Sequence, residues 1–242
     1  MSSLPALGFG VVAASANLLG AWAVTRSARL GLRVIELLFA FAAGFMLALA
    51  LVGVVPEALR RDPETGAVVV LLGYLLVHLT QHTATPHFHF GRETHHVTHA
   101  AGVSGIVGLL LHTFFDGVAI ASGFLVSAQL GLLLFLAIFL HKLPEGVTVS
   151  SLVLAAGESP RRAVLAAAAL GVATILGVLL TEQADVLVRH GLALSAGVTL
   201  YVGASNLVPE FQSKPGWRLP AAFFVGAGSF VGAQALLDRL LA

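Results

Sequence analysis

The sequence predicts an all-α integral membrane protein in which eight transmembrane helices form an inverted repeat around two central helices. Hydrophobic residues make up 57% of the 242 residues and charged residues only 10%, whereas a soluble domain carries about 25% charged residues. Eight spans of about 20 residues each, with short loops, use up a chain of this length. We therefore expect residues 1–242 to form a single eight-helix membrane domain without a large soluble part.

Apolar stretches, separated by polar residues and helix breakers, set the limits of the expected spans. Ser159 and Pro160 form an N-cap and first-turn pair that starts the sixth of them. In the eighth, small residues from Gly226 to Gly232 favour close helix packing, either within the protomer or across a homodimer. The eight expected spans are 4–24, 33–59, 66–82, 101–125, 129–155, 161–181, 187–210 and 218–240.

A repeat links the second and seventh expected spans. Gly44-x-x-Leu47 leads to Val55-Pro56-Glu57 with the same spacing at which Gly197-x-x-Leu200 leads to Val208-Pro209-Glu210. Because five crossings separate the two copies, they run in opposite directions through the membrane. This pattern predicts an inverted repeat of helices 1–3 and 6–8, with helices 4 and 5 between the halves.

The loop charges predict the orientation. Basic residues are more frequent in the loops on the cytoplasmic side of a membrane. When the larger set of basic loop residues is placed in the cytoplasm, both termini lie outside a cell inner (plasma) membrane. The start of the chain lacks a positively charged region, so we expect no cleavable signal peptide. The net charge of +1 gives no sign of nucleic-acid binding. The larger set is Arg26, Arg29, Arg33, Arg92, Arg161, Arg162, Lys214 and Arg218, against Arg60, Arg61, Arg189 and Arg239.

The two central spans carry the candidate functional residues. His112 and Asp116 lie four residues apart in the fourth span, and His141 and Glu145 lie four apart in the fifth, so each pair shares one helical face. Ionisable groups within a membrane span are costly and indicate function. Two imidazoles and two carboxylates that face one another can bind a divalent transition metal.

Two further residues of the fifth span bear on this interpretation. In a structural alternative, Lys142 neutralises one carboxylate and the two pairs are buried charges, but this leaves both histidines unexplained. Pro144 has no N–H and crowds the carbonyl group four residues earlier, so the carbonyl of Leu140 is freed beside the candidate ligands.

The segments His112-Thr113-Phe114-Phe115-Asp116-Gly117 and His141-Lys142-Leu143-Pro144-Glu145-Gly146 resemble the paired signature of the ZIP family of divalent-metal transporters, in its prokaryotic type. The resemblance implies that His112, Asp116, His141 and Glu145 bind metal, and that Met46 on the second span adds a thioether. It also implies an elevator-type movement of the central helices, with Asn206 and Glu210 on the cytoplasmic exit pathway.

The resemblance further implies a second metal position, and the sequence departs from it. Thr113 replaces an asparagine, Lys142 replaces an acidic or polar ligand, and Thr174 lies nearest to an expected glutamate. An ammonium group at the position of a second ion would hold Glu145 ionised. We therefore predict a mononuclear site.

A polar loop, residues 83–100, follows the third expected span on the cytoplasmic side. With the end of the third span, it holds seven of the ten histidines, and neutral imidazole suits zinc, copper, nickel and iron(II). The loop could take up released metal, or its histidines could be solvated and inessential. The accessory ligands expected here are His82, His87, His89, His95, His96 and His99.

These patterns favour transport of divalent metal ions toward the cytoplasm over two alternatives. Zn²⁺ fits the donor set best, with Fe²⁺, Cd²⁺, Co²⁺ and Mn²⁺ as further ions. The alternatives are an intramembrane zinc-dependent hydrolase, which would need an open position for water on the metal, and a metal sensor that does not transport. We expect no enzymatic activity and no required cofactor, and metal ions and the lipid bilayer as partners.

Overall fold

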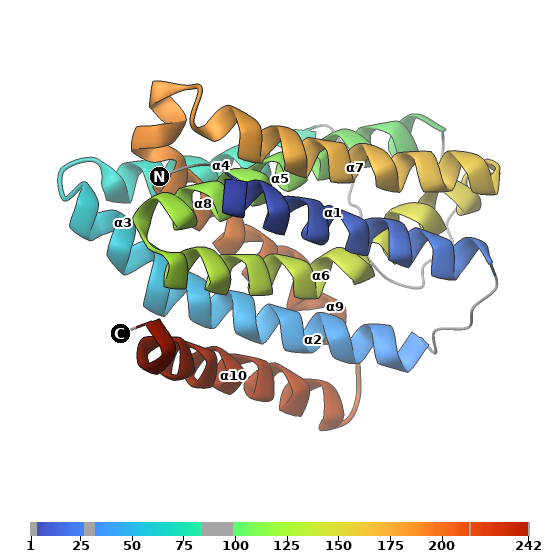
Figure 1. Ribbon diagram of the computed structural model, residues 1–242. Helices are drawn as coiled ribbons and strands as arrows, with labels where there is room; N and C mark the ends of the chain where they lie inside the picture. The colour runs from blue at the N-terminus through green and yellow to red at the C-terminus, as the bar shows by residue number, and fades with distance from the viewer. Residues whose placement is uncertain (1–3, 27–31, 84–98, 213, 242) are drawn as a thin grey trace.

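The computed structural model describes residues 4–26, 32–83, 99–212 and 214–241, and these residues form helices and no strands. Figure 1 shows the helices lying roughly side by side in one bundle. The helices in chain order are α1 (Leu4–Thr25), α2 (Leu32–Ala48), η1 (Leu49–Val54), α3 (Val55–Arg61), α4 (Gly66–Thr83), α5 (His99–Val126), α6 (Ala128–Ala155), α7 (Pro160–Thr181), α8 (Asp185–Tyr201), η2 (Val202–Leu207), α9 (Pro209–Gln212) and α10 (Arg218–Leu241).

The all-α membrane architecture predicted from the sequence is confirmed. Seven helical stretches of the described chain are long and apolar enough to cross a membrane, and a shorter apolar helix covers Gly66–Gln81. The predicted span limits agree with the helices to within a few residues, since α2, η1 and α3 form one span and α8, η2 and α9 form another. Ser159 caps α7 as expected, because its side chain accepts a hydrogen bond from the backbone N–H of Arg162.

The repeat seen in the sequence has a counterpart in the backbone. Both η1 and η2 are π-helical turns, and each ends just before the segment that contains Pro56 or Pro209. Proline cannot donate a backbone hydrogen bond and crowds the carbonyl group four residues earlier, and a wider turn relieves that crowding. Accordingly, the N–H of Val208 bonds to the carbonyl of Gly203, five residues back. Residues 49–54 and 202–207 are related by the same offset of 153 positions as Gly44 and Gly197.

The helices pack in two kinds of group. Helices α1, α5, α6 and α7 contact one another and form what we call the central bundle, while α2 pairs with α10 and α4 pairs with α8. The two outer pairs are equivalent under the 153-residue offset. A Cβ added to Gly44 would lie 1.9 Å from the carbonyl oxygen of Phe223, and one added to Gly197 would lie 1.9 Å from that of Val70. Each pair therefore joins helices from opposite halves of the chain.

The central bundle is held by equally close backbone contacts. A Cβ added to Gly117 would lie 1.9 Å from the carbonyl oxygen of Thr174, and one added to Gly146 would lie 2.1 Å from that of Asn17. These glycines let α5 approach α7, and α6 approach α1, almost backbone to backbone. The contacts occur beside Asp116 and Glu145, so they fix the two helix segments from which those carboxylates project.

Candidate metal centre

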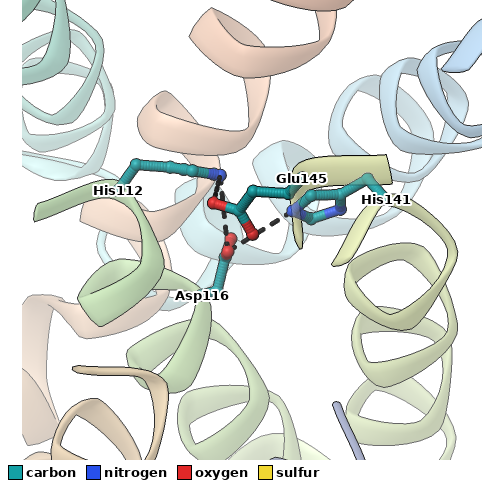
Figure 2. A group of neighbouring side chains, drawn as sticks. All are labelled: His112, Asp116, His141 and Glu145. Atoms are coloured by element: carbon teal, nitrogen blue, oxygen red, sulfur yellow. Dashed lines mark hydrogen bonds and ion pairs between the residues drawn. The ribbon is translucent and has the colours of Figure 1, made fainter. Parts of the chain in front are cut away.

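The four residues predicted to bind metal converge in the middle of the protein. Figure 2 shows His112 and Asp116 from α5 pointing toward His141 and Glu145 from α6. One ligand atom from each lies within 4.8 Å of the others, and all four residues are buried. Each of the two neighbouring helices, α5 and α6, therefore contributes one imidazole and one carboxylate to the group. The structure thus brings together the four side chains that the sequence analysis expected to bind metal.

Hydrogen bonds orient some of the possible metal-binding atoms toward the centre of this group, and other such atoms make no hydrogen bond. His141 Nδ1 lies 3.0 Å from the carbonyl oxygen of Ala137, and since only a protonated ring nitrogen can donate to a carbonyl, Nε2 keeps its lone pair. That Nε2 atom and His112 Nε2 each lie 3.4 Å from Asp116 Oδ2. Glu145 Oε1 is buried without a hydrogen-bond partner in the described chain. Together they present nitrogen and oxygen lone pairs at a common point.

Lys142 supplies the only positive charge that the described residues place among these carboxylates. Its Nζ atom lies 2.7 Å from Asp116 Oδ2 and 2.8 Å from Glu145 Oε2, and its side chain is fully buried. The ammonium group therefore bridges the two acidic residues that come from different helices. A buried ion pair with good geometry offsets the cost of removing its charges from water.

Asn17 of α1 also belongs to the site and was missed in the sequence analysis. With its amide nitrogen turned toward the available acceptors, it donates to Glu145 Oε2 at 3.3 Å and to the backbone carbonyl of Lys142. Asn17 and Lys142 thus hold one oxygen of Glu145 and leave the other free. The available signal was an amide residue within an otherwise apolar helix.

Thr113 and Thr174, the other two residues at the predicted second metal position, donate no hydrogen bond to Asp116 or Glu145 among the described residues. The hydroxyl group of Thr113 donates to the carbonyl of Leu110, and that of Thr174 donates to the carbonyl of Leu170. Both side chains are fully buried. They satisfy their hydrogen bonds within their own helices, as threonine commonly does in apolar surroundings.

A small cavity of about 20 Å³ adjoins the site. The residues that line it are the polar His112, His141, Glu145 and Asn206 and the apolar Phe39, Leu109, Val202 and Leu207. The structure therefore places Asn206, expected on the exit pathway, in the lining of a cavity shared with three of the four candidate metal ligands. Met46 is fully buried in the apolar core and is not among the described residues that line the cavity. Its role as a ligand stays a prediction.

Several sequence-predicted residues fall outside what the structure describes. The loop histidines His87, His89, His95 and His96 lie outside the described residues, and the side chains of His82, His99 and Glu210 are likewise not described. Their predicted roles remain untested.

Comparison with known proteins assigns the family. The model of a family described as ZIP zinc transporter matches residues 100–234, which is more than half of the chain. The chain belongs to the ZIP family. The matched region contains both central helices and all four candidate metal ligands, and it extends into α10.

Curated relatives agree with this assignment. Human zinc transporter ZIP6 is 32% identical over 136 residues, which are 52% of this chain and 18% of the relative. Human zinc transporter ZIP13 is 30% identical over 183 residues, 67% of this chain and 46% of the relative. Human zinc transporter ZIP4 is 34% identical over 111 residues, 43% of this chain and 16% of the relative. The chain thus spans less than half the length of these ZIP relatives, which are named as transporters and not as enzymes.

Proposed function

We propose that this ZIP-family protein carries divalent transition metal ions, Zn²⁺ above all, across a membrane toward the cytoplasm. The observation that carries the proposal is the buried convergence of His112, Asp116, His141 and Glu145 within 4.8 Å of one another. Imidazole nitrogens and carboxylate oxygens form a donor set that suits Zn²⁺, Fe²⁺, Co²⁺ and Mn²⁺. The names of the curated relatives point to the same cargo.

The orientation of the donors supports reversible binding. Metal ions bind deprotonated carboxylates and neutral imidazoles, and the hydrogen bond from His141 Nδ1 to Ala137 directs the free lone pair of Nε2 toward the site. The unpartnered Oε1 atom of Glu145 is a second prepared donor. A buried polar atom without a partner costs free energy, and coordination of a metal ion would recover it.

We propose that the site holds one metal ion and that Lys142 replaces a second. Asp116 and Glu145 carry two negative charges when ionised, and the Lys142 ammonium lies within 2.8 Å of both. One divalent ion leaves the cluster with a small net charge, whereas a second would place three excess positive charges in a region sheltered from water. Such an excess is strongly unfavourable at low dielectric constant.

The division of the helices into groups supports alternating access by movement of the central bundle. Both metal-binding helices, α5 and α6, belong to that bundle, and their closest backbone contacts are to α7 and α1 of the same bundle. The central bundle could therefore move as a unit against α2 and α8, in the manner of an elevator. The distribution of basic loop residues separately predicts that both termini lie outside the cell.

Zinc flux into proteoliposomes tests the proposed function. We expect Zn²⁺ uptake by the wild-type protein and loss of uptake in the His112→Ala, Glu145→Ala double variant, because each change removes a ligand and leaves buried charges without partners. An exposed substitution on α10, Gly228→Ala, is a suitable control, since a Cβ there meets no atom within 4 Å. Near-normal uptake by the double variant, correctly inserted, would refute the proposed site.

A further inference from the structure

We infer that Asn17 of α1 is a positioning residue that makes Glu145 bind the transported metal through one oxygen atom, and that it thereby favours Zn²⁺ over ions that need more ligands. The inference rests on the proposed function and concerns the same site. The buried residues of α1 are all alanine or glycine except Asn17. A buried carboxamide costs free energy unless hydrogen bonds satisfy it, so its place on this small and apolar face indicates a role other than packing.

The close approach of α1 to α6 fixes where the Asn17 side chain lies. A Cβ added to Gly146 would lie 2.1 Å from the backbone carbonyl oxygen of Asn17. One added to Gly20, a turn further along α1, would lie 2.3 Å from the carbonyl oxygen of Leu143. The two helices therefore meet almost backbone to backbone at the turn of α6 that carries Glu145. A side chain as short as that of asparagine reaches the carboxylate from this crossing.

The carboxylate of Glu145 is held at one oxygen and open at the other. Oε2 accepts a hydrogen bond from the amide nitrogen of Asn17 at 3.3 Å and one from the ammonium group of Lys142 at 2.8 Å. Oε1 makes no hydrogen bond to the described residues and lies 4.0 Å from His112 Nε2. Glu145 therefore turns a single free oxygen toward the other candidate ligands.

Asn17 and Lys142 hold that oxygen in different ways. The ammonium group of Lys142 is shared between Glu145 and Asp116, and its charge acts on both carboxylates. The amide of Asn17 is neutral, and it also donates to the backbone carbonyl of Lys142. Asn17 thus ties the carboxylate to the helix segment from which it projects, and it sets the orientation of Glu145 without compensating its charge.

A single oxygen from Glu145 limits the number of ligands that the site offers. With one nitrogen each from His112 and His141 and one oxygen from Asp116, the site has four donors, the coordination number that Zn²⁺ usually adopts in proteins. Mn²⁺ prefers an octahedral set of oxygen donors, and the adjoining cavity has room for about one water molecule. Release of Oε2 would let Glu145 bind through both oxygens and add a fifth donor. Asn17 therefore acts on the choice between metals as well as on affinity.

Equilibrium binding of Zn²⁺ and Mn²⁺ to the purified full-length protein tests this inference. The loop histidines are changed to serine throughout, so that binding to the loop does not contribute. We expect Asn17→Ala to weaken Zn²⁺ binding about tenfold or more, as loss of a hydrogen bond to a metal ligand commonly does. Binding of Mn²⁺ should be unchanged or tighter, so that the ratio of Zn²⁺ to Mn²⁺ affinity falls by a similar factor.

The visible absorption of bound Co²⁺ reports the number of ligands directly. Four-coordinate Co²⁺ absorbs visible light much more strongly than five- or six-coordinate Co²⁺, so the absorption per bound ion should be weaker in Asn17→Ala than in the wild type. Asn17→Leu should show the same two changes. Its side chain branches at the same carbon atom, so it fills the space that alanine leaves empty and admits no water in place of the amide.

Two substitutions on α1 are the matched controls. Gly20→Ala disturbs the crossing with α6 but keeps the amide of Asn17. Ser15 is exposed, and its hydroxyl group donates to the carbonyl of Val12, so Ser15→Ala changes a polar group away from the site. Both should keep the affinity ratio and the Co²⁺ absorption of the wild type. Equal changes in Gly20→Ala and Asn17→Ala would assign the effect to helix packing and overturn the inference.

The His112→Ala, Glu145→Ala variant separates failure of this inference from failure of the proposed function. If that variant loses metal binding while Asn17→Ala and Asn17→Leu keep the wild-type ratio and absorption, the inference is wrong and the proposed site stands. If that variant binds metal as the wild type does, the proposed function fails and the inference falls with it.

Discussion

The ammonium group of Lys142 lies 2.7 Å from Asp116, a residue on the neighbouring helix. The same ammonium lies 2.8 Å from Glu145 on its own helix, so one fixed cation joins the two carboxylates of the metal centre. In the mononuclear site that we propose, this ammonium group takes the place of a second ion.

Removal of the Lys142 charge should destabilise the metal-free protein more than removal of a nearby neutral group. In Lys142→Met the volume is nearly kept, but Asp116 and Glu145 lose their shared partner. Breaking a buried ion pair on one side costs about 3–5 kcal/mol. The measurement is the unfolding midpoint in detergent with and without Zn²⁺, and the stabilisation by Zn²⁺ should be larger in the variant than in the wild type.

Thr113→Val is the matched control for that measurement. Thr113 occupies the position in α5 that corresponds to Lys142 in α6, and its hydroxyl group bonds only within its own helix. Its loss should cost about 1 kcal/mol. Equal destabilisation by both variants would show that the Lys142 charge does not stabilise the two carboxylates.

Close approach of α5 and α7 should be essential to the central bundle. Gly117→Ala would place a Cβ 1.9 Å from the Thr174 carbonyl oxygen and 2.8 Å from the Val178 amide nitrogen. Both are backbone atoms, so the helices must separate, and we expect a loss of about 1–3 kcal/mol or more. Thermal unfolding checks this value against Gly228→Ala, where the added methyl group has open space. A similar midpoint for the two variants would argue against the close packing described here.

A second metal position should be recoverable by substitution. The triple variant Thr113→Asn, Lys142→Asp, Thr174→Glu replaces the internal cation with a carboxylate and adds donors from α5 and α7. All three residues are buried within the central bundle, next to Asp116 or to the α5–α7 contact. Metal content of the purified variant, measured at saturating Zn²⁺, should rise by one ion relative to the wild type. An unchanged content in a folded variant would mean that these positions do not define a second site.

The polar loop should modulate transport without forming the pathway. Removal of residues 84–98, or replacement of the loop histidines by serine, should leave basal Zn²⁺ flux largely intact and change the response of flux to metal load. The reasoning is that the four candidate ligands lie on α5 and α6, within the helical bundle. Flux is measured in proteoliposomes at low and high Zn²⁺. Complete loss of flux in a correctly folded variant would place the loop on the pathway.

Helix positions and the four candidate metal ligands followed from local sequence patterns. Long apolar stretches set the spans, and the spacing of His112 with Asp116, and of His141 with Glu145, placed each pair on one helical face. The repeat around Pro56 and Pro209 was also visible, although the π-helical turns before these prolines were not predicted. Those turns depend on how the backbone relieves local crowding, which composition does not show.

The contact of Asn17 with Glu145 was not predicted, and Asn206 was expected on the exit pathway but not beside the candidate ligands, because both placements depend on packing between distant parts of the chain. Asn17 reaches Glu145 because Gly20 and Gly146 let α1 and α6 approach closely. Asn206 reaches the cavity through a wide turn on another helix. The sequence supplied Lys142 and its spacing from Glu145, and the structure adds the distances from its ammonium group to both carboxylates. Its role in place of a second ion stays a prediction.

Metal stoichiometry tests the central claim most directly. The protein is purified with the loop histidines changed to serine, saturated with Zn²⁺, freed of loosely bound ions, and analysed for metal per polypeptide. The contact between Lys142 and both carboxylates predicts one tightly held Zn²⁺ per chain, lost in the His112→Ala, Glu145→Ala variant. Two tightly held ions per chain in the protein that retains Lys142 would contradict the mononuclear site.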